Sequence, residues 1–394
     1  MTKENGKPQI RFAKFKDTWE QRKFSDIATR ESSISTSTTD VPSVEYEDVI
    51  AEEGRLNKDI HLKEAVKSGI TFDGSQVLYG KLRPYLHNWL NPDFKGIAVG
   101  DWWVLKPINM DKKFLYRLIQ TQQFDNIANQ SSGSKMPRAD WNLISNSEFM
   151  VPPSKEEQSK IGRYFDSLDN LITLHQRKYD KLTKVKKSML EKMFPKNGTN
   201  VPEIRFKGFT DAWEQRKLGD IITEYKETVD SDCTLPILTS SKTEGVILQE
   251  EHFGRKQQHD ITGYNILPRN YCTYRNRSDG VDFTFNINKC CDKGIISKFY
   301  PVFSGKNSDV FFLSLVLNNS EEVVREIAYT CTGTGQKVLS FLDLQKMKVR
   351  VPNFDEQKEI AAYFESLDHI ITLHQRKLEK LKILKKACLE KMFV

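Results

Sequence analysis

The sequence predicts an α+β protein with a pseudo-two-fold internal repeat, in which two mixed α/β domains are separated by two long antiparallel helices that form a coiled coil. Three observations predict this fold. Two blocks of sequence recur in both halves of the chain, the stretches between them do not match, and the second block carries apolar residues at helical spacing.

The repeated blocks open and close each half. Residues 8–27 match residues 202–221 at about 13 of 20 positions, and residues 157–194 match 356–393 at about 24 of 38. The inserts, 30–150 and 222–350, share almost nothing. We therefore expect a first mixed domain in 1–150, a first long helix in 151–195, a linker and second mixed domain in 196–350, and a second long helix in 351–394.

Both long helices have start signals. Ser154 stands three residues before Glu157, as in a capping box, and Asn353 is a candidate cap in the second copy. Pro195 and Gly198 end the first helix. Each helix should contain about 38 residues and span roughly 57 Å.

A helix of this length with one apolar stripe needs a partner, and the sister helix is the obvious one. Tandem copies related by two-fold symmetry would pair antiparallel, with the inserts at opposite ends. Segment 10–12 should then lie near the end of the second helix, as 204–206 follows the first. The residues expected in the helix–helix interface are Leu168, Leu171, His175, Leu182, Leu367, Ile370, His374 and Leu381.

His175 and His374 should meet near the midpoints of the two helices. We expect them to be interface residues and not metal ligands, because no carboxylate or thiol accompanies them in the sequence.

Composition restricts the class of protein only loosely. The chain has 60 Lys and Arg against 53 Asp and Glu, a net charge of +7 that permits a nucleic-acid partner without requiring one. No stretch approaches the roughly 18 apolar residues of a membrane span, and the N-terminus lacks the apolar core of a signal peptide. The six cysteines form no C-x-x-C pair and are expected to be reduced thiols of a cytoplasmic protein.

The inserts carry candidate DNA contacts on loops. Arginine pairs bidentately with guanine, Asn and Gln pair with adenine, and small-residue loops approach phosphates through backbone N–H groups. The first insert offers a segment rich in aromatic and basic residues and, later, a small-residue loop; the second offers "YCTYRNRSDG" and "CTGTGQK". The candidate DNA-binding residues are Tyr79, Lys81, Arg83, Tyr85, His87, Ser134, Lys135, Arg138, Tyr274, Arg275, Asn276, Arg277, Thr334, Gln336 and Lys337.

Catalytic motifs are not recognisable. "TGTGQK" lacks the spacing of a phosphate-binding loop, and "NPDF" departs from the N-P-P-[FY] loop of amino-methyltransferases at Asp93. There is no H-E-x-x-H, no G-x-S-x-G and no evident cluster of metal ligands. A non-catalytic DNA reader is therefore favoured. The alternatives are a stand-alone methyltransferase or nuclease with a diverged motif, and a coiled-coil scaffold that binds only protein.

The whole chain resembles the specificity subunit of type I restriction-modification systems. The resemblance is carried by two divergent inserts alternating with two near-identical long helices, by "VPPSKEEQSKIGRYF" and "VPNFDEQKEIAAYF" at the helix starts, and by "GKLRPY" in the first insert. The second insert has "YRNRS" in the corresponding region, so its contacts are less well indicated.

The resemblance implies that each insert is a target recognition domain for one half of an asymmetric, bipartite DNA site. It also implies that the helices set the gap between the halves and dock two methyltransferase subunits. Motor-nuclease subunits would complete the assembly. S-adenosylmethionine, ATP and Mg²⁺ would be bound by those partners, with no cofactor or metal held by this chain and no membrane involved.

Overall fold

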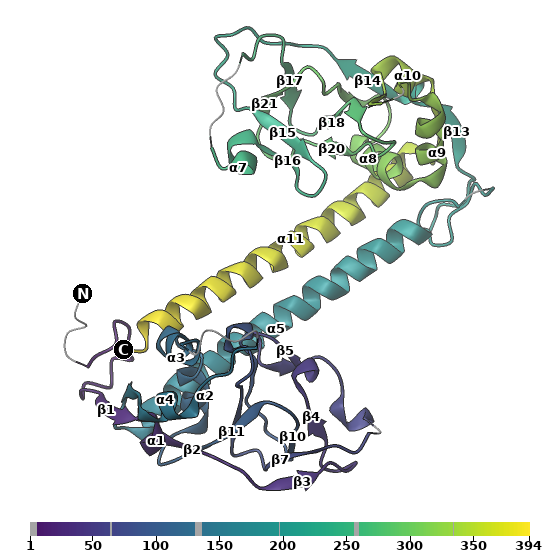
Figure 1. The fold of residues 1–394 in the computed structure, drawn as a ribbon. Helices are drawn as coiled ribbons and strands as arrows, with labels where there is room; N and C mark the ends of the chain where they lie inside the picture. The colour runs from purple at the N-terminus through teal and green to yellow at the C-terminus, as the bar shows by residue number, and fades with distance from the viewer. Residues whose placement is uncertain (1–5, 64, 131–135, 197, 256–259, 334) are drawn as a thin grey trace. The chain divides into compact units, whose positions relative to one another are not determined.

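The computed structural model describes residues 6–63, 65–130, 136–196, 198–255, 260–333 and 335–394. The chain divides into two compact units, Met1–Lys178 with His374–Val394 (unit 1) and Tyr179–Leu373 (unit 2). The division passes through two long helices, α5 (Lys155–Lys192) and α11 (Phe354–Lys391). Each unit therefore consists of a mixed domain and one segment of each long helix (Figure 1).

Both long helices contain 38 residues, which confirms the predicted length. Their caps are also as predicted: Glu157 N donates to Ser154 Oγ at 3.4 Å, and Glu356 N donates to Asn353 Oδ1 at 3.0 Å. In a full capping box the Glu157 carboxylate would accept a hydrogen bond from Ser154 N. Here that carboxylate accepts two hydrogen bonds from Arg11, at 2.6 and 2.8 Å.

The two helices pair antiparallel within each unit. In unit 1, Tyr164 Oη lies 3.6 Å from Cys388 Sγ and Asp169 pairs with Lys385 at 2.7 Å, so rising residue numbers in α5 meet falling numbers in α11. In unit 2, Lys186 pairs with Asp368 at 2.5 Å. The antiparallel pairing expected from the tandem repeat is confirmed.

The contact face of α5 follows a heptad repeat, alternating steps of four and three residues. Leu168 is 5% exposed and Leu182 packs against the core of unit 2. Leu171 is 44% exposed, because the series passes through its half-buried neighbour Ile172 instead. A position one residue away points about 100° further round the helix.

The same pattern holds in α11. Leu367 is 8% exposed and Leu381 packs against the core of unit 1. Ile370 is 37% exposed, and the half-buried Ile371 takes the heptad position. The prediction that Leu171 and Ile370 lie buried between the helices was therefore wrong, whereas the other six interface residues lie on the paired face.

The domain of unit 1 contains two four-stranded sheets. One sheet has the order β2-β11-β8-β9 with all neighbours antiparallel, and the other has the order β3-β7-β10-β4. The strands are β1 (Glu20–Lys23), β2 (Ala28–Arg30), β3 (Ile34–Thr36), β4 (Ser43–Val44), β5 (Val49–Ile50), β6 (Arg55–Leu56), β7 (Ser68–Phe72), β8 (Val77–Gly80), β9 (Trp89–Leu90), β10 (Gly96–Ala98), β11 (Trp102–Pro107) and β12 (Glu148–Val151). The short helices are α1 (Phe24–Ile27), α2 (Lys112–Leu118), α3 (Gln122–Ala128) and α4 (Trp141–Asn146).

The domain of unit 2 contains one four-stranded antiparallel sheet, β14-β22-β18-β20, with several two-stranded ribbons. Its strands are β13 (Glu214–Lys217), β14 (Ile222–Tyr225), β15 (Leu238–Ser241), β16 (Gly245–Leu248), β17 (Asn265–Pro268), β18 (Cys272–Tyr274), β19 (Arg277–Ser278), β20 (Phe285–Ile287), β21 (Lys293–Ile296), β22 (Val302–Gly305), β23 (Lys337–Val338) and β24 (Lys348–Val351). Its short helices are α6 (Leu218–Ile221), α7 (Gln249–Phe253), α8 (Val310–Asn319), α9 (Glu321–Thr330) and α10 (Phe341–Lys346).

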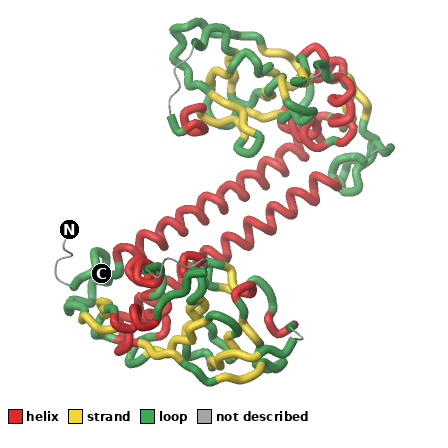
Figure 2. Tube along the Cα trace, in the orientation of Figure 1, coloured by secondary structure: helices red, strands yellow, loops and turns green. Residues whose placement is uncertain are grey.

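The two domains share a plan that their sequences do not reveal. The strand order β2-β11-β8-β9 of unit 1 corresponds to β14-β22-β18-β20 of unit 2, and in both domains the sheet strands are followed by three short helices. Strands β1 and β12 pair in unit 1 as β13 and β24 pair in unit 2. In Figure 2 the strands of each domain are yellow, and the segments of α5 and α11 are helical throughout. The inserts diverged in sequence and retained the sheet.

The ends of each unit close on the long helices as predicted. Ile10 N donates to Lys391 O at 2.9 Å in unit 1, and Ile204 N donates to Lys192 O at 2.9 Å in unit 2. In unit 2, Arg205 pairs with Glu356 at 2.6 Å through two hydrogen bonds, which repeats the pairing of Arg11 with Glu157 in unit 1.

Candidate nucleic-acid interface

The candidate DNA loops of unit 1 lie side by side. Residues 81–83 follow strand β8, and residues 137–139 precede helix α4. The two segments are joined by hydrogen bonds from Arg83 N to Pro137 O (2.7 Å) and from Ala139 N to Lys81 O (2.8 Å). A bridge between Leu82 and Arg138 completes the pair. Two segments about 55 residues apart in the sequence therefore form one surface.

The candidate loops of unit 2 are joined in the same way. Strand β19 pairs with β23, which sets Arg277 opposite Val338 and Ser278 opposite Lys337. Leu339 N donates to Asn276 O at 3.0 Å. Strand β19 follows the sheet strand β18, and β23 precedes helix α10, as the corresponding segments do in unit 1.

Equivalent backbone bonds define which residues correspond. Lys81 N donates to Asp101 O at 2.9 Å, and Asn276 N donates to Phe299 O at 2.9 Å. Lys81 and Asn276 therefore occupy equivalent positions, 195 residues apart, which is close to the repeat length. The four segments selected on residue type form two equivalent loop pairs, one in each unit.

Two of the predicted DNA contacts are core residues. Tyr79 is 2% exposed and packs on Trp103, with ring centroids 5.7 Å apart. Tyr274 is 0% exposed, and its hydroxyl donates to Leu339 O at 3.1 Å. Burial raises the pKa of both hydroxyls far above the ordinary value. A side chain inside a core has no surface for DNA, so the assignment of these two tyrosines as contacts is corrected: each supports its loop from below.

The other residues of the first segment take different positions. Tyr85 is 52% exposed. Arg83 is half-buried with a left-handed backbone (φ 49°), and its Nε is buried with no hydrogen-bond partner among the described residues. The ring nitrogens of His87 lie 2.9 Å from Asp125 Oδ1 and 3.4 Å from Glu52 Oε1. His87 therefore faces carboxylates, which is not the environment expected for a residue that reads DNA.

Several candidate DNA-binding residues of unit 2 lie on the surface. Arg275, Arg277 and Gln336 are exposed, and Asn276 is half-buried. Lys337 Nζ donates to Gly333 O at 2.9 Å, which ties the lysine to its own loop. The predicted contacts Ser134, Lys135 and Thr334 lie outside the described residues.

Asp101 organises the charges of the first loop pair. Its carboxylate accepts hydrogen bonds from Arg138 Nε at 3.2 Å and Nη2 at 3.0 Å, and Lys81 Nζ lies 3.5 Å away. The Arg138 guanidinium, with Lys81 beside it, holds the pKa of Asp101 below its ordinary value. One carboxylate thus orders two cations on the surface of the loop pair.

Tyr46 braces the same loop from the sheet side. Its hydroxyl donates to Asp101 O at 2.5 Å and accepts from Leu82 N at 3.0 Å. Burial raises the pKa of this hydroxyl above its ordinary value, so Tyr46 remains a neutral donor and acceptor. Sequence reasoning missed Tyr46, Asp101 and Phe299, because their roles depend on contacts between segments far apart in the chain. Tyr79 and Tyr274 stand 195 residues apart, close to the repeat length, and this spacing was the signal in the sequence that the two loops are equivalent.

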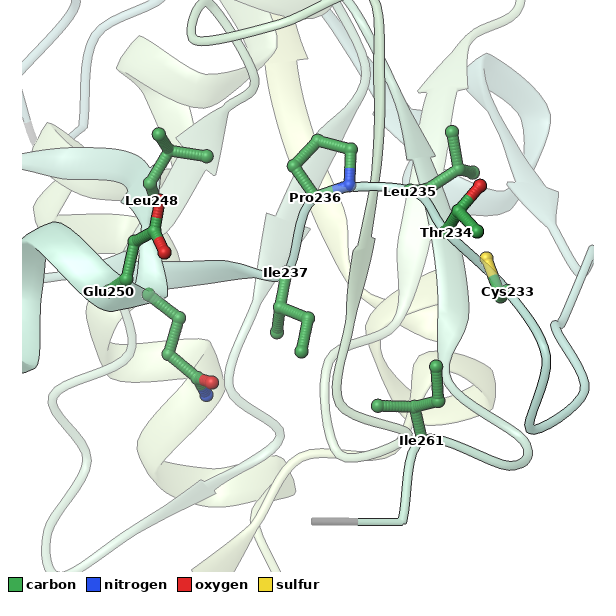
Figure 3. Close-up of a pocket in the computed structure, with 9 residues that line it drawn as sticks. Cys233, Thr234, Leu235, Pro236, Ile237, Leu248, Glu250 and Ile261 are labelled. Atoms are coloured by element: carbon green, nitrogen blue, oxygen red, sulfur yellow. The ribbon is translucent and has the colours of Figure 1, made fainter. Parts of the chain in front are cut away.

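Within the described ranges there is no group of three or more His, Cys, Asp or Glu side chains placed to hold a metal ion. A hollow of about 420 Å³ in unit 2 is lined by Cys233, Thr234, Leu235, Pro236, Ile237, Leu248, Gln249, Glu250 and Ile261 (Figure 3). Most of these side chains are apolar, and Glu250 is the one carboxylate in that lining. All six cysteines are free. No helix in the described part of the chain is both long and apolar enough to span a bilayer.

Comparison with known proteins gives a consistent family. The model of the type I restriction modification DNA specificity domain matches residues 16–184 and again residues 210–383. The chain is 22% identical over 298 residues to the specificity subunit of type I restriction enzyme MjaVIII from Methanocaldococcus jannaschii, an alignment covering 70% of this chain and 68% of that protein. The crystal structure of the type I restriction-modification S subunit from M. genitalium superposes with a TM-score of 0.64 at 12% identity, covering 98% of this chain and 99% of that one.

Proposed function

Because the chain belongs to the family of type I restriction modification DNA specificity domains and matches that domain twice, we propose that each of its mixed domains reads one half of an asymmetric, bipartite DNA sequence. The observation that carries this proposal is the pairing of the candidate loops: segments chosen on residue type alone come together once in each unit, through the same backbone hydrogen bonds. The side chains on the two loop pairs differ, so the half-sites they read should differ too.

The long helices would fix the gap between the half-sites. Each helix is continuous over 38 residues and is shared by the two units, and its capping hydrogen bonds are in place. A paired helix resists bending better than an extended linker does. Dimeric DNA-binding proteins set half-site spacing by the same geometric logic.

Two modification subunits would dock on equivalent apolar surfaces of the helices. Leu171 and Leu174 are 44% and 46% exposed in unit 1, and Ile370 and Leu373 are 37% and 42% exposed at the matching positions of unit 2. Contiguous exposed apolar patches mark protein–protein contacts, and the two side chains of each pair are neighbours on one helix face because they stand three residues apart. One such pair in each unit suits two copies of one partner.

The chain itself would perform no chemical step. Methyl transfer and cleavage would fall to modification and restriction subunits, which would hold S-adenosylmethionine, ATP and Mg²⁺. The absence of a recognisable nucleotide-binding or nucleophile motif in the sequence supports this division of roles. An assembly of this kind would act on cellular DNA in the cytoplasm.

Methylation mapping tests the proposal. The chain is expressed in bacteria with type I modification subunits, and modified sites in the genome are sequenced. We expect one asymmetric sequence with two parts and a fixed gap. Arg83→Ala should relax or abolish the first part only, and Asn276→Ala should change the second part only. Arg163→Ala is the control, because Arg163 lies exposed on α5 outside both loop pairs.

Three outcomes would contradict the proposal. Methyl transfer or cleavage by the purified chain alone would indicate an enzyme. Binding to protein partners without any salt-dependent affinity for DNA would indicate a scaffold, because phosphate contacts weaken steeply as salt rises. Equal loss of both half-sites from Arg83→Ala would indicate damaged folding.

A further inference from the structure

Each loop pair contains an arginine supported by the residue that also fixes the loop. Asp101 and Phe299 occupy equivalent positions, because the carbonyl of each accepts the hydrogen bond that anchors its recognition loop. The side chain of each then contacts a guanidinium on the surface of the loop pair, Arg138 in unit 1 and Arg277 in unit 2. The two contacts differ in chemistry, and the two arginines lie on opposite segments of the loop pair. Arg277 occupies the position of Leu82, which is bridged to Arg138 in unit 1.

In unit 1 the support is a carboxylate. Asp101 accepts from Nε and Nη2 of Arg138, which is the side edge of the guanidinium. Guanine presents O6 and N7, which accept a bidentate pair of hydrogen bonds from a guanidinium. The Arg138 side chain is 52% exposed, and that of Asp101 is 25% exposed. Asp101 therefore fixes the plane of the Arg138 guanidinium through two hydrogen bonds.

In unit 2 the support is an aromatic ring. The Arg277 guanidinium carbon lies 4.5 Å from the centroid of the Phe299 ring, and Phe299 is 37% exposed. Stacking fixes the plane of a guanidinium and leaves its N–H groups in that plane. Lys298 Nζ also lies near the ring, at 5.9 Å.

We propose that Asp101 and Phe299 are positioning residues, each of which orients an arginine fork, Arg138 or Arg277, toward a guanine in its own half-site. This proposal rests on the proposed function and makes it specific: each half-site contains a guanine read in the major groove. Arginine loses much side-chain freedom when it is held, and a fork that is already oriented loses less on binding.

A negative charge at the position of Asp101 makes the proposal testable. DNA repels a carboxylate, so removing the charge should not weaken general affinity and should slightly strengthen it. A loss of base preference with retained affinity is thus the signature of lost orientation. A residue that only stabilised the fold would not separate the two measurements.

The experiment uses the full chain assembled with type I modification subunits and a library of random-sequence DNA duplexes, from which bound sequences are selected and counted. For Asp101→Asn we expect the preference for guanine at one position of the first half-site to fall about tenfold, with the second half-site unchanged. For Phe299→Leu the same loss should appear in the second half-site alone. Asp101→Glu and Phe299→Tyr are the conservative variants and should retain most of the preference.

A double variant distinguishes loss of arginine orientation from misfolding. Arg138→Lys keeps the charge and removes the fork, so it should cost the same guanine preference, and adding Asp101→Asn to it should cost little more, because the two residues act as one unit. If Asp101→Asn does not fold, Arg138→Lys with Asp101→Glu still tests the pair.

The outcomes are distinct. If the wild-type assembly selects no sequence, the proposed function fails. If it selects a bipartite sequence and Asp101→Asn keeps its full guanine preference, the positioning proposal alone fails. It also fails if the affected position is an A·T pair, or if affinity changes equally on all sequences.

Discussion

At the scale of single residues, one attachment of the domain to the long helices differs between the two units. Arg117 on helix α2 is 1% exposed and pairs with Asp166 and Asp169 of α5, both at 2.7 Å. In unit 2 the corresponding position on α8 is Leu315, which packs in the apolar core. The sheet plan is common to the two units, but this position holds a buried cation in unit 1 and an apolar side chain in unit 2.

Burial makes the anchor of unit 1 vulnerable. Coulombic attraction to Asp169 and Asp166 outweighs burial and raises the pKa of Arg117, so this guanidinium stays charged. Breaking a buried ion pair by removing one partner costs about 3–5 kcal/mol, because the remaining charges lose compensation.

We therefore expect Arg117→Met to lower the free energy of unfolding of unit 1 by about 3 kcal/mol while leaving unit 2 unchanged. Amide hydrogen exchange of residues 112–118 reports the stability of unit 1, and that of residues 310–319 reports the stability of unit 2. Arg163→Met is the matched control on the exposed face of α5. Unchanged protection of 112–118 would show that the ion pair does not anchor the domain.

At the scale of the elements, the midpoint of the helix pair is polar. His175 Nδ1 lies 2.8 Å from His374 Nδ1, as expected for interface residues that meet at the crossing. A hydrogen bond between two imidazoles needs at least one neutral ring to accept it. Burial lowers the pKa of both histidines; His374 lowers that of His175 further, and Lys178 and Lys377 lower both.

The sign of the pH dependence follows from these shifts. The pKa of each ring is below the value of about 6.5 expected in the unfolded chain, so the unfolded chain binds more protons between the two values. The stability contributed by the pair is present above about pH 6.5 and is lost as the pH falls through the lowered pKa.

We expect protection factors for the amides of residues 168–178 and 374–384 to fall between pH 7.5 and pH 5.5. Replacing both histidines, His175→Gln with His374→Gln, should flatten this dependence. His369→Gln on the same helix should leave it intact, because His369 is exposed and lies outside the pair. An equal fall in the double variant would assign the pH dependence to other groups.

The sequence predicted these helices well because their signals are local. Ser154, Asn353 and the heptad spacing act within a few residues, and the repeat supplied the partner. The face was misjudged only where two adjacent residues, Leu171 and Ile172, are both apolar and the pattern cannot say which one is buried. The candidate loops were found from residue type, but Asp101 and Phe299 were not, because each acts through a backbone bond to a distant segment.

At the scale of the whole molecule, the duplicated plan explains how one chain can recognise two different sequences. The helix segments, their caps and the closing hydrogen bonds are repeated in both units. Under the proposed function, the repeated parts would bind the partner subunits and the divergent inserts would determine the DNA sequences. A change of insert can then alter one half-site without disturbing the other.

The repeated helices also predict how the gap between half-sites can be altered. Inserting four residues after Lys178 and four after Lys377 keeps the helix register on both sides of the midpoint, because in an antiparallel pair each insertion faces native residues of the other helix. The insertions separate His175 from His374, which meet at the midpoint. The connection should lengthen by about 6 Å at 1.5 Å per residue, which corresponds to about two base pairs of duplex. Inserting seven residues at both places keeps the heptad and should add about three base pairs.

Methylation mapping of the variants reads the gap directly, with both half-sites expected to stay unchanged. An insertion after Lys178 alone is the control: it shifts the register of α5 against α11 and should abolish modification. A gap that stayed constant in both double insertions would show that the helices do not set the spacing.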